Sequence, residues 1–417
     1  MSDAVLTGFD HRDVPLASAD GAVSTGWTRG RTVSAAIVAL ATGLMGLGAV
    51  MTFSAAATIN ERMIGWPFWH YPALRQLVFL VGALVAMLIM TQVPYRIWRG
   101  ARGLPAVFLL LVALAASVAV LVPGIGLEVN NARRWLGFGP ARWGLRIQPS
   151  EVVKVALPIF LSVWMANRAD IRRFWRGFLP AVCAIGVSVG MVGIEDFGTA
   201  ALLAAVGGAM LMAGGAKWRH ISLLVLPAVP AFGYLLTSRA HRLERLITFL
   251  DIWRDPEGKG YQAIQSLCTI ASGGWWGRGL GNGYVKGYLP AARTDFIFSV
   301  ICEELGMVGA VAVIGLLIAL VWNGREAFLR CADPMGRLLA FGITMTIGMQ
   351  AVMNVAVVTV SVPTKGIALP LVSAGGSGAI VMGGLVGILA NIPRLSGAAG
   401  LRPSGNALAG GGRAEGT

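Results

Sequence analysis

The chain has 417 residues, of which 56% are hydrophobic and only 13% are charged. Because soluble globular domains have about 25% charged residues, this composition excludes an ordinary soluble protein. The net charge of +14 by itself suggests nucleic-acid binding, but the placement of the basic residues favours a membrane protein, and we expect no nucleic-acid partner.

Apolar segments recur along the whole chain, and most reach the roughly 18 residues that can cross a bilayer as a helix. Ten are found, of which the fourth to the sixth are short: 33–57, 75–93, 104–122, 151–166, 177–193, 198–214, 219–236, 296–322, 336–361 and 367–392. The sequence therefore predicts an all-α polytopic membrane protein, with a ten-helix domain over 33–392. We expect disordered cytoplasmic tails at 1–32 and 393–417, which are rich in small residues.

Arginine and lysine gather in alternate short loops, as the positive-inside rule predicts for cytoplasmic loops. These clusters lie at 96–102, 168–176, 217–219 and 325–337. The pattern places both termini in the cytoplasm. It places 123–150, and a large loop at 237–295 between helices 7 and 8, outside the cell, although both are cationic. Cations held outside against the rule indicate an anionic partner there, and anchoring to lipid headgroups is the alternative.

Three carboxylates lie at the start of the eighth apolar segment: Asp295, Glu303 and Glu304. A carboxylate near the centre of a bilayer costs about 2.5 kcal/mol or more, so each needs a reason. Asp295 stands at the outer edge, within reach of water and a polar substrate. On a helix it lies about 12 Å from Glu303, farther than the roughly 5–9.5 Å of paired glycosidase carboxylates. For the two glutamates we favour a structural role, satisfied by partners inside the bundle.

The stretch "IQPSEVVKVALP" begins the fourth span. Ser150 is a good N-cap, Glu151 suits the positive end of a helix, and Lys154 lies on the same face. Two readings are open: an ion pair at the membrane interface, or a Lys and Glu lining a cavity beneath the cationic loop.

Two later stretches also carry polar residues at span edges. In "IEDFGTAALL", Asp196 precedes a span and Thr199 follows three residues later, as in a simple helix cap. In "SVPTKGIALPLVSAGGSGAIVMGG", residues 361–384, proline, glycine and serine break the backbone. Irregular backbone at membrane depth persists only where protein buries it or water lines it. This stretch therefore predicts a re-entrant element or a cavity wall.

The order of these motifs resembles the SEDS family (shape, elongation, division and sporulation) of cell-wall polymerases. The family pattern runs N-G-x-R-x-W, Q-P-S-E-x-x-K, P-D-x-G-T, Y-Q-x-x-Q-S, S-G-G-x-x-G-x-G, L-P-x-x-x-T-D-F, E-E-x-G and P-L-P-x-x-S-x-G-G-S. The matching residues are Asn130, Arg133, Trp135, Gln148–Glu151, Lys154, Asp196, Gly198, Thr199, Tyr261, Gln262, Gln265, Ser266, Ser272–Gly281, Leu289, Pro290, Thr294–Phe296, Glu303, Glu304, Gly306, Leu369, Pro370, Ser373 and Gly375–Ser377. The match covers nearly the whole membrane domain.

The resemblance implies a peptidoglycan glycosyltransferase that polymerises lipid II, an undecaprenyl-pyrophosphate disaccharide-pentapeptide, at the outer face of the bacterial cytoplasmic membrane. It implies Asp295 as the general base, Lys154 and Arg75 at the pyrophosphate, and Glu151 orienting Lys154. The full set of implied substrate-site residues is Arg75, Arg133, Glu151, Lys154, Asp196, Lys365 and Ser373. A divalent cation, Mg²⁺ or Mn²⁺, between Asp295 and phosphate is left open, although the sequence has no cysteine or histidine cluster typical of a metal site.

The segments 249–262 and 363–366 are most similar to the cell-division branch of the family, with the cell-elongation branch as the alternative. The division branch implies a septal location and, as partners, a class B penicillin-binding protein transpeptidase, other divisome proteins and membrane lipids. A lipid II flippase and an inactive division scaffold are rival functions. The polar motifs cluster at the outer face, whereas an alternating-access carrier has its site near the midplane.

Overall fold

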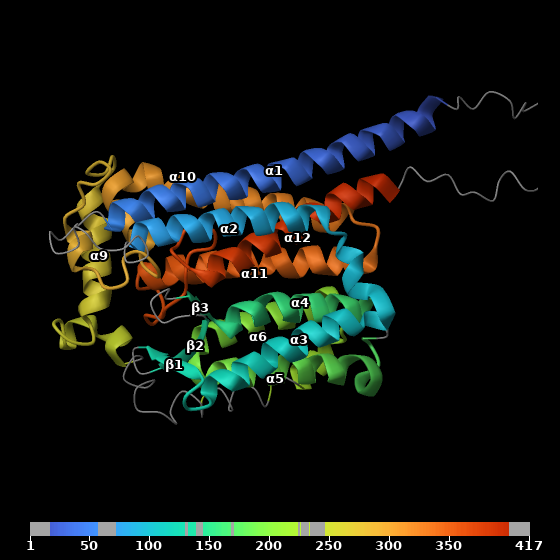
Figure 1. Ribbon diagram of the computed structural model, residues 1–417, viewed down its shortest axis with the longest axis horizontal. Helices are drawn as coiled ribbons and strands as arrows, with labels where there is room; N and C mark the ends of the chain where they lie inside the picture. The colour runs from blue at the N-terminus through green and yellow to red at the C-terminus, as the bar shows by residue number, and fades with distance from the viewer. Residues whose placement is uncertain are drawn as a thin grey trace, which may run out of the picture.

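The protein is a bundle of long helices, capped at one end by a small sheet and a short crossing helix (Figure 1). The computed structural model describes residues 17–56, 72–129, 132–138, 145–167, 171–223, 226, 233 and 247–399. The α-helices are α1 (Ala17–Ala56), α2 (Pro72–Gln92), α3 (Gly100–Leu121), α4 (Pro149–Asn167), α5 (Leu179–Glu195), α6 (Phe197–Ala213), α9 (Tyr261–Gly273), α10 (Ile297–Arg330), α11 (Pro334–Val358) and α12 (Ser377–Ala399). The strands and short helical turns are β1 (Gly126–Val129), β2 (Ala132–Phe138), β3 (Leu145–Ile147), η3 (Tyr95–Arg99), η5 (Phe174–Phe178), η6 (Ile252–Arg254) and η7 (Val285–Tyr288).

Eight helices in the described part of the chain are long and apolar enough to cross a membrane. The shorter apolar helix α6 coincides with the predicted sixth span. The predicted seventh span, 219–236, lies mostly outside the described residues. The prediction of an all-α polytopic membrane protein is confirmed.

Both ends of the predicted membrane domain differ from the structure. Helix α1 begins at Ala17, so residues 17–32, expected in a disordered tail, are helical. The last helix begins at Ser377, ten positions after the predicted start at 367, and it continues to Ala399 into the predicted tail. The late start has a local cause, because Pro370 and the turn at Gly376, which has a φ of 50°, interrupt the helical backbone. The remaining tail residues, 1–16 and 400–417, lie outside the described residues.

The helices form two packed groups (Figure 1). One hydrophobic core joins α1, α2, α10, α11 and α12, and a second joins α3, α4, α5 and α6. Helices α11 and α4 contact each other across the two groups. The described chain ends at Ala17 and Ala399 both lie at the end of the bundle opposite α9.

A three-stranded antiparallel sheet, in the order β1-β2-β3, occupies the segment that the sequence predicted only as a loop. In β1 and β2, Glu128 is the register partner of Arg133. Because successive side chains of a strand point to opposite faces, Arg133 and Arg134 leave β2 on different sides.

Helix α10 is broken at Gly306, where φ is 67° and ψ is −166°. The extended backbone of 274–279 lies against this break: Arg278 N donates to Glu303 O at 2.9 Å, and Met307 N donates to Gly274 O at 3.0 Å. The positive φ strongly favours glycine. A Cβ at Gly306 would also collide with the backbone at Trp275 and Gly277. The first half of α10, residues 297–305, is therefore a short helix of its own, with Asp295 just before its start.

Candidate active site

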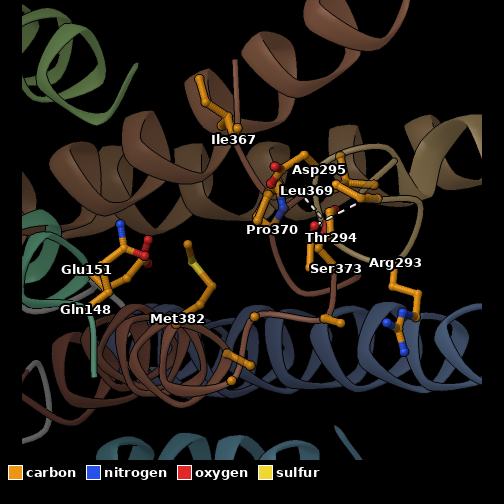
Figure 2. A pocket seen from close by; sticks show the side chains of 18 of the residues that line it. Gln148, Glu151, Arg293, Thr294, Asp295, Ile367, Leu369, Pro370, Ser373 and Met382 are labelled. Atoms are coloured by element: carbon orange, nitrogen blue, oxygen red, sulfur yellow. Dashed lines mark hydrogen bonds between the residues drawn. The ribbon is translucent and has the colours of Figure 1, made fainter. Parts of the chain in front are cut away.

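A cavity of about 800 Å³ lies between the two helix groups, and residues of the sheet form part of its lining. Figure 2 shows some of the side chains that line it. Its wall is assembled from the first turns of α2, α4 and α6, from β2 and β3, and from α11 and α12. The irregular segments 290–295 and 364–376 complete it. The second of these is the stretch for which the sequence predicted a re-entrant element or cavity wall, and the cavity-wall reading is confirmed.

The structure brings seven of the eight predicted site residues to this cavity: Arg75, Glu151, Lys154, Asp196, Asp295, Lys365 and Ser373. Arg133 is the exception, since it does not line this cavity. Its guanidinium pairs with the Glu128 carboxylate at 3.3 Å. The next residue of β2, Arg134, lines the cavity instead.

The backbone that carries Asp295 is fixed by side chains from the bundle (Figure 2). Asn354 Nδ2, on α11, donates to Asp295 O at 2.7 Å. Ser373 Oγ donates to Thr294 O at 2.6 Å and accepts a hydrogen bond from Leu369 N at 2.7 Å. These bonds tie the turn before α10 to the irregular segment before α12. The position of the Asp295 carboxylate is therefore set by tertiary contacts.

The Asp295 carboxylate is half-buried against Gly366, where any side chain would crowd it. Burial raises the pKa of Asp295 to about 6, because removal from water disfavours the charged form. That value also includes the negative charge of Asp196, which raises the pKa, and the positive charge of Arg134, which lowers it. Asp295 is thus a stronger base than an exposed carboxylate while still ionising below neutral pH.

Lys154 and Glu151 form an ion pair at 2.7 Å in the cavity wall, with Lys154 buried. Lys154 Nζ also donates to Gln350 Oε1 at 3.0 Å, and Gln350 Nε2 donates to Ala368 O at 2.9 Å. The spacing left an interface pair and a cavity lining open. The structure supports the cavity lining, since the pair links α4 to α11 and to the segment before α12.

Asp196 caps α6, as its position before Thr199 suggested. One carboxylate oxygen accepts from Thr199 N at 3.1 Å, and the other accepts from Thr199 Oγ1 at 2.8 Å. Gln148 Nε2 also reaches the second oxygen at 3.5 Å. Nearby, the Lys365 ammonium lies 3.5 Å from the centre of the Phe197 ring, a cation–π contact.

Three cavity arginines were not singled out from the sequence: Arg134, Arg146 and Arg293. Arg75 lies within electrostatic range of the last two. The Nε atom of Arg134 is buried and has no hydrogen-bond partner within the described part of the chain. In the sequence, only the cationic character of the two outer loops pointed to these arginines. It predicted an anionic partner but did not identify which arginines would contact it. Gln350 could also have been recognised from the sequence, because it is a polar residue inside an apolar helix.

The described residues contain no group of three or more His, Cys, Asp and Glu placed to hold a metal ion. The two other carboxylates that line the cavity already have partners. Asp196 accepts a hydrogen bond from Thr199, and Glu151 forms an ion pair with Lys154. A divalent cation beside Asp295 would therefore lack a preformed set of protein ligands.

The sequence model of the FtsW, RodA and SpoVE proteins, described as a cell cycle protein family, matches residues 34–397. The chain belongs to this family. FtsW-named relatives are similar over most of their length, and each is called a probable peptidoglycan glycosyltransferase. The protein of Geobacter sp. strain M18 is 38% identical, over 87% of this chain and 97% of its own length. That of Nitrosococcus halophilus is 39% identical, over 83% of this chain and 88% of its own length.

Two solved structures share the fold of this chain. A chain of a peptidoglycan synthase complex, studied for the structural coordination of polymerization and crosslinking, superposes with a TM-score of 0.70 and 29% identity. It matches 86% of this chain and 97% of its own length. RodA, the rod shape determining protein of Thermus thermophilus, gives a TM-score of 0.61 and 27% identity, over 86% of this chain and 96% of its own.

Proposed function

We propose that this chain is a peptidoglycan glycosyltransferase of the FtsW kind, which polymerises lipid II into glycan strands at the outer face of the cytoplasmic membrane. The names of its relatives support the class of enzyme. The observation that carries the mechanism is Asp295, a half-buried carboxylate with a raised pKa on the wall of a cavity rich in arginine and lysine. The FtsW relatives and the Pro-Thr-Lys-Gly segment support a role in division over one in elongation.

Asp295 acts as the general base. It accepts the proton of the acceptor's 4-hydroxyl while that oxygen forms a bond to C1 of the donor sugar. The bond from C1 to the pyrophosphate oxygen breaks, and its electron pair leaves with the pyrophosphate. A base is most effective when its pKa lies near the working pH. A pKa of about 6 leaves Asp295 ionised at neutral pH and still basic enough to help.

The cavity cations stabilise the negative charge that develops on the leaving pyrophosphate. Lys154 is held in place by Glu151 and Gln350 at 2.7 and 3.0 Å. Arg75, Arg146 and Arg293 supply further positive charge along the same wall. Pyrophosphate is a good leaving group, so a general acid is not required and one carboxylate base is sufficient.

The two engaged carboxylates of the cavity have different tasks. Glu151 orients Lys154 through the ion pair. Asp196 holds the start of α6 through Thr199, and its negative charge helps to raise the pKa of Asp295. Neither carboxylate takes the proton of the acceptor hydroxyl.

A lipid II flippase would use the same cavity for transport. The placement of Asp295 and the cations at one end of the bundle favours polymerisation, because an alternating-access site lies near the midplane. The two functions separate in one experiment. Purified protein with a class B penicillin-binding protein is given lipid II, in detergent and in sealed vesicles. Glycan ladders on a gel in detergent support the polymerase, whereas lipid II translocation in vesicles without glycan in detergent supports the flippase.

The outer location of the cavity has its own test. In a background without native cysteines, Gly258→Cys in the large loop should react with a membrane-impermeant maleimide on intact spheroplasts. Ala332→Cys, between α10 and α11, should not react, and both positions are exposed in the structure. Labelling of Ala332→Cys together with protection of Gly258→Cys would place Asp295 in the cytoplasm and contradict the proposal.

The partner we propose is a class B penicillin-binding protein, which would cross-link the strands made by this chain. The support is the similarity to a chain of a peptidoglycan synthase complex. Co-purification of the two proteins from membranes, and stimulation of glycan synthesis by the partner, are the expected observations.

A further inference from the structure

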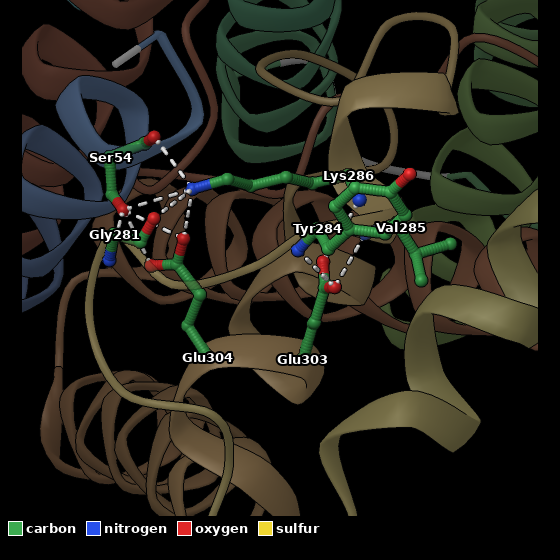
Figure 3. Close-up of polar contacts among 7 residues, drawn as sticks. All are labelled: Ser54, Gly281, Tyr284, Val285, Lys286, Glu303 and Glu304. Carbon is green, nitrogen blue, oxygen red and sulfur yellow. Dashed lines mark hydrogen bonds and ion pairs between the residues drawn. The ribbon is translucent and has the colours of Figure 1, made fainter. Parts of the chain in front are cut away.

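The adjacent carboxylates Glu303 and Glu304 are fully buried and take no part in the chemistry above (Figure 3). Glu303 accepts three backbone hydrogen bonds, from Tyr284 N and Val285 N at 2.8 Å and from Lys286 N at 3.0 Å. It thereby binds the start of η7. The sequence predicted a structural role for the two glutamates, and the structure confirms it.

Glu304 holds a different set of groups. It forms an ion pair with the buried ammonium of Lys286 and accepts from Ser54 Oγ at 2.7 and 2.6 Å. Lys286 Nζ also donates to Ser54 O, at the end of α1, at 2.9 Å. Ser54 Oγ in turn accepts from Gly281 N at 3.0 Å. The ion pair and its hydrogen bonds thus join η7 and the loop before it to the end of α1 and to the first half of α10.

These contacts close a ring of chain around Asp295. Lys286 and Glu303 are 17 positions apart, and Asp295 lies between them. On one side the ring is covalent, running from η7 through Leu289 to Asp295 and into α10. On the other side it is closed by the carboxylates of Glu303 and Glu304. Because the break at Gly306 separates residues 297–305 from the rest of α10, the rigidity of the long helix is not available to hold this half in place.

We propose that the Lys286–Glu304 ion pair, together with Ser54, is a positioning element that holds Asp295 at the cavity wall. The expected effect on kcat rests on the proposed function, whereas the ring of contacts is a feature of the structure alone. Lys286 and Glu304 do not touch the cavity, and Asp295 is fixed from the other side by Asn354 and Ser373. The backbone at Asp295 is therefore held both by the ring and by Asn354 and Ser373, and loss of the ring contacts should let Asp295 move.

The test needs variants that break the ring without leaving a buried, unpaired charge. Loss of one partner of a buried pair is strongly destabilising, whereas replacement of both by neutral residues is often neutral. The double variant Lys286→Met/Glu304→Gln meets this condition. The matched control is Glu326→Gln, which breaks the exposed Glu326–Arg330 pair at 2.6 Å on the same helix, far from Asp295 along the chain.

We expect the double variant to keep the melting temperature of the wild type within a few degrees and to lose about 10- to 100-fold in kcat, because a displacement of about 1 Å can cost that much. The KM for lipid II should stay within twofold, and Glu326→Gln should match the wild type. The pH profile gives a second signature. Asp295 faces Asp196 and Arg134, and greater solvation of the loosened carboxyl should lower the pH at which activity is half-maximal.

Amide hydrogen exchange measures the rigidity of the ring independently of glycan synthesis. Peptides covering 289–296 should exchange faster in the double variant than in the wild type and in Glu326→Gln. Unchanged exchange, or unchanged kcat with faster exchange, would overturn the positioning role. A double variant that keeps both the stability and the kcat of the wild type would also overturn it, because that is the result expected of a purely structural pair. If the wild type makes no glycan at all, the proposed function is wrong, and the exchange data alone decide whether the ring holds Asp295.

Discussion

The raised pKa of Asp295 predicts that activity and stability change in opposite directions with pH. Each pH unit by which a pKa differs between the folded and unfolded protein corresponds to about 1.4 kcal/mol. A rise from 3.8 to about 6 therefore means that ionising Asp295 costs the folded protein about 3 kcal/mol. The cause is chiefly burial, which Asp295→Asn leaves in place while it removes the charge.

The sign follows from proton linkage. The folded protein binds the Asp295 proton more tightly than the unfolded chain, so this stabilisation is fully present below about pH 4 and is lost as pH rises through about 6. The Asn variant has no such dependence. From pH 4 to pH 8 its free energy of unfolding should gain up to about 3 kcal/mol relative to that of the wild type. Glycan synthesis by the wild type should instead rise over the same range, with a midpoint near pH 6.

The assay is unfolding of both purified proteins in the same detergent at closely spaced pH values, with the rate of lipid II polymerisation measured on the same samples. The difference between the two proteins removes the contribution of every other titrating group. A difference that does not vary with pH, or an Asn variant that loses stability toward pH 8, would refute the reasoning about burial. An activity midpoint near pH 4 would show that Asp295 is solvated like an exposed carboxylate.

Three further predictions follow from the cavity and the helix break. Lys154→Met should lower glycan synthesis about 10- to 100-fold, as expected for loss of a charge-assisted hydrogen bond, and full activity in a gel assay would contradict its role at the pyrophosphate. Arg134→Ala should raise the KM for lipid II, while the matched Arg133→Ala, on the other face of β2, should leave it unchanged; equal effects would count against the observed register. Gly306→Ala should lower the melting temperature, since its backbone conformation costs other residues about 1–3 kcal/mol. Gly315→Ala, in the same helix with open space around it, should not, and similar melting of the two variants would contradict the strained turn.

The spans and much of the cavity could be predicted from the sequence because each depends on local information. Runs of apolar residues define α2, α3 and α11 whatever their neighbours are. The spacing of Glu151 and Lys154 on one helix face is likewise a local property. The irregular segment before α12 was predicted from its proline and glycine residues, which interrupt a helix in any context.

The features that the sequence did not predict depend on register or on distant partners. Arg133 was chosen where Arg134 lines the cavity, because a shift of one residue in a strand exchanges its faces and the strand itself was not expected. The partners of Glu304 are equally remote, since Ser54 is 250 positions away. A carboxylate inside a predicted span indicates that a polar partner exists, but only the tertiary fold identifies that partner.

The central claim, that Asp295 is the base of an outer-face glycosyltransferase, is tested most directly by the Asp295→Asn variant. Wild type and variant are purified with the same class B penicillin-binding protein, given lipid II, and the glycan product is resolved on a gel. We predict that the variant folds and keeps its partner but loses about 10²- to 10⁴-fold in rate, the contribution of a general base. Glycan strands made by Asp295→Asn at nearly the wild-type rate would contradict the assignment.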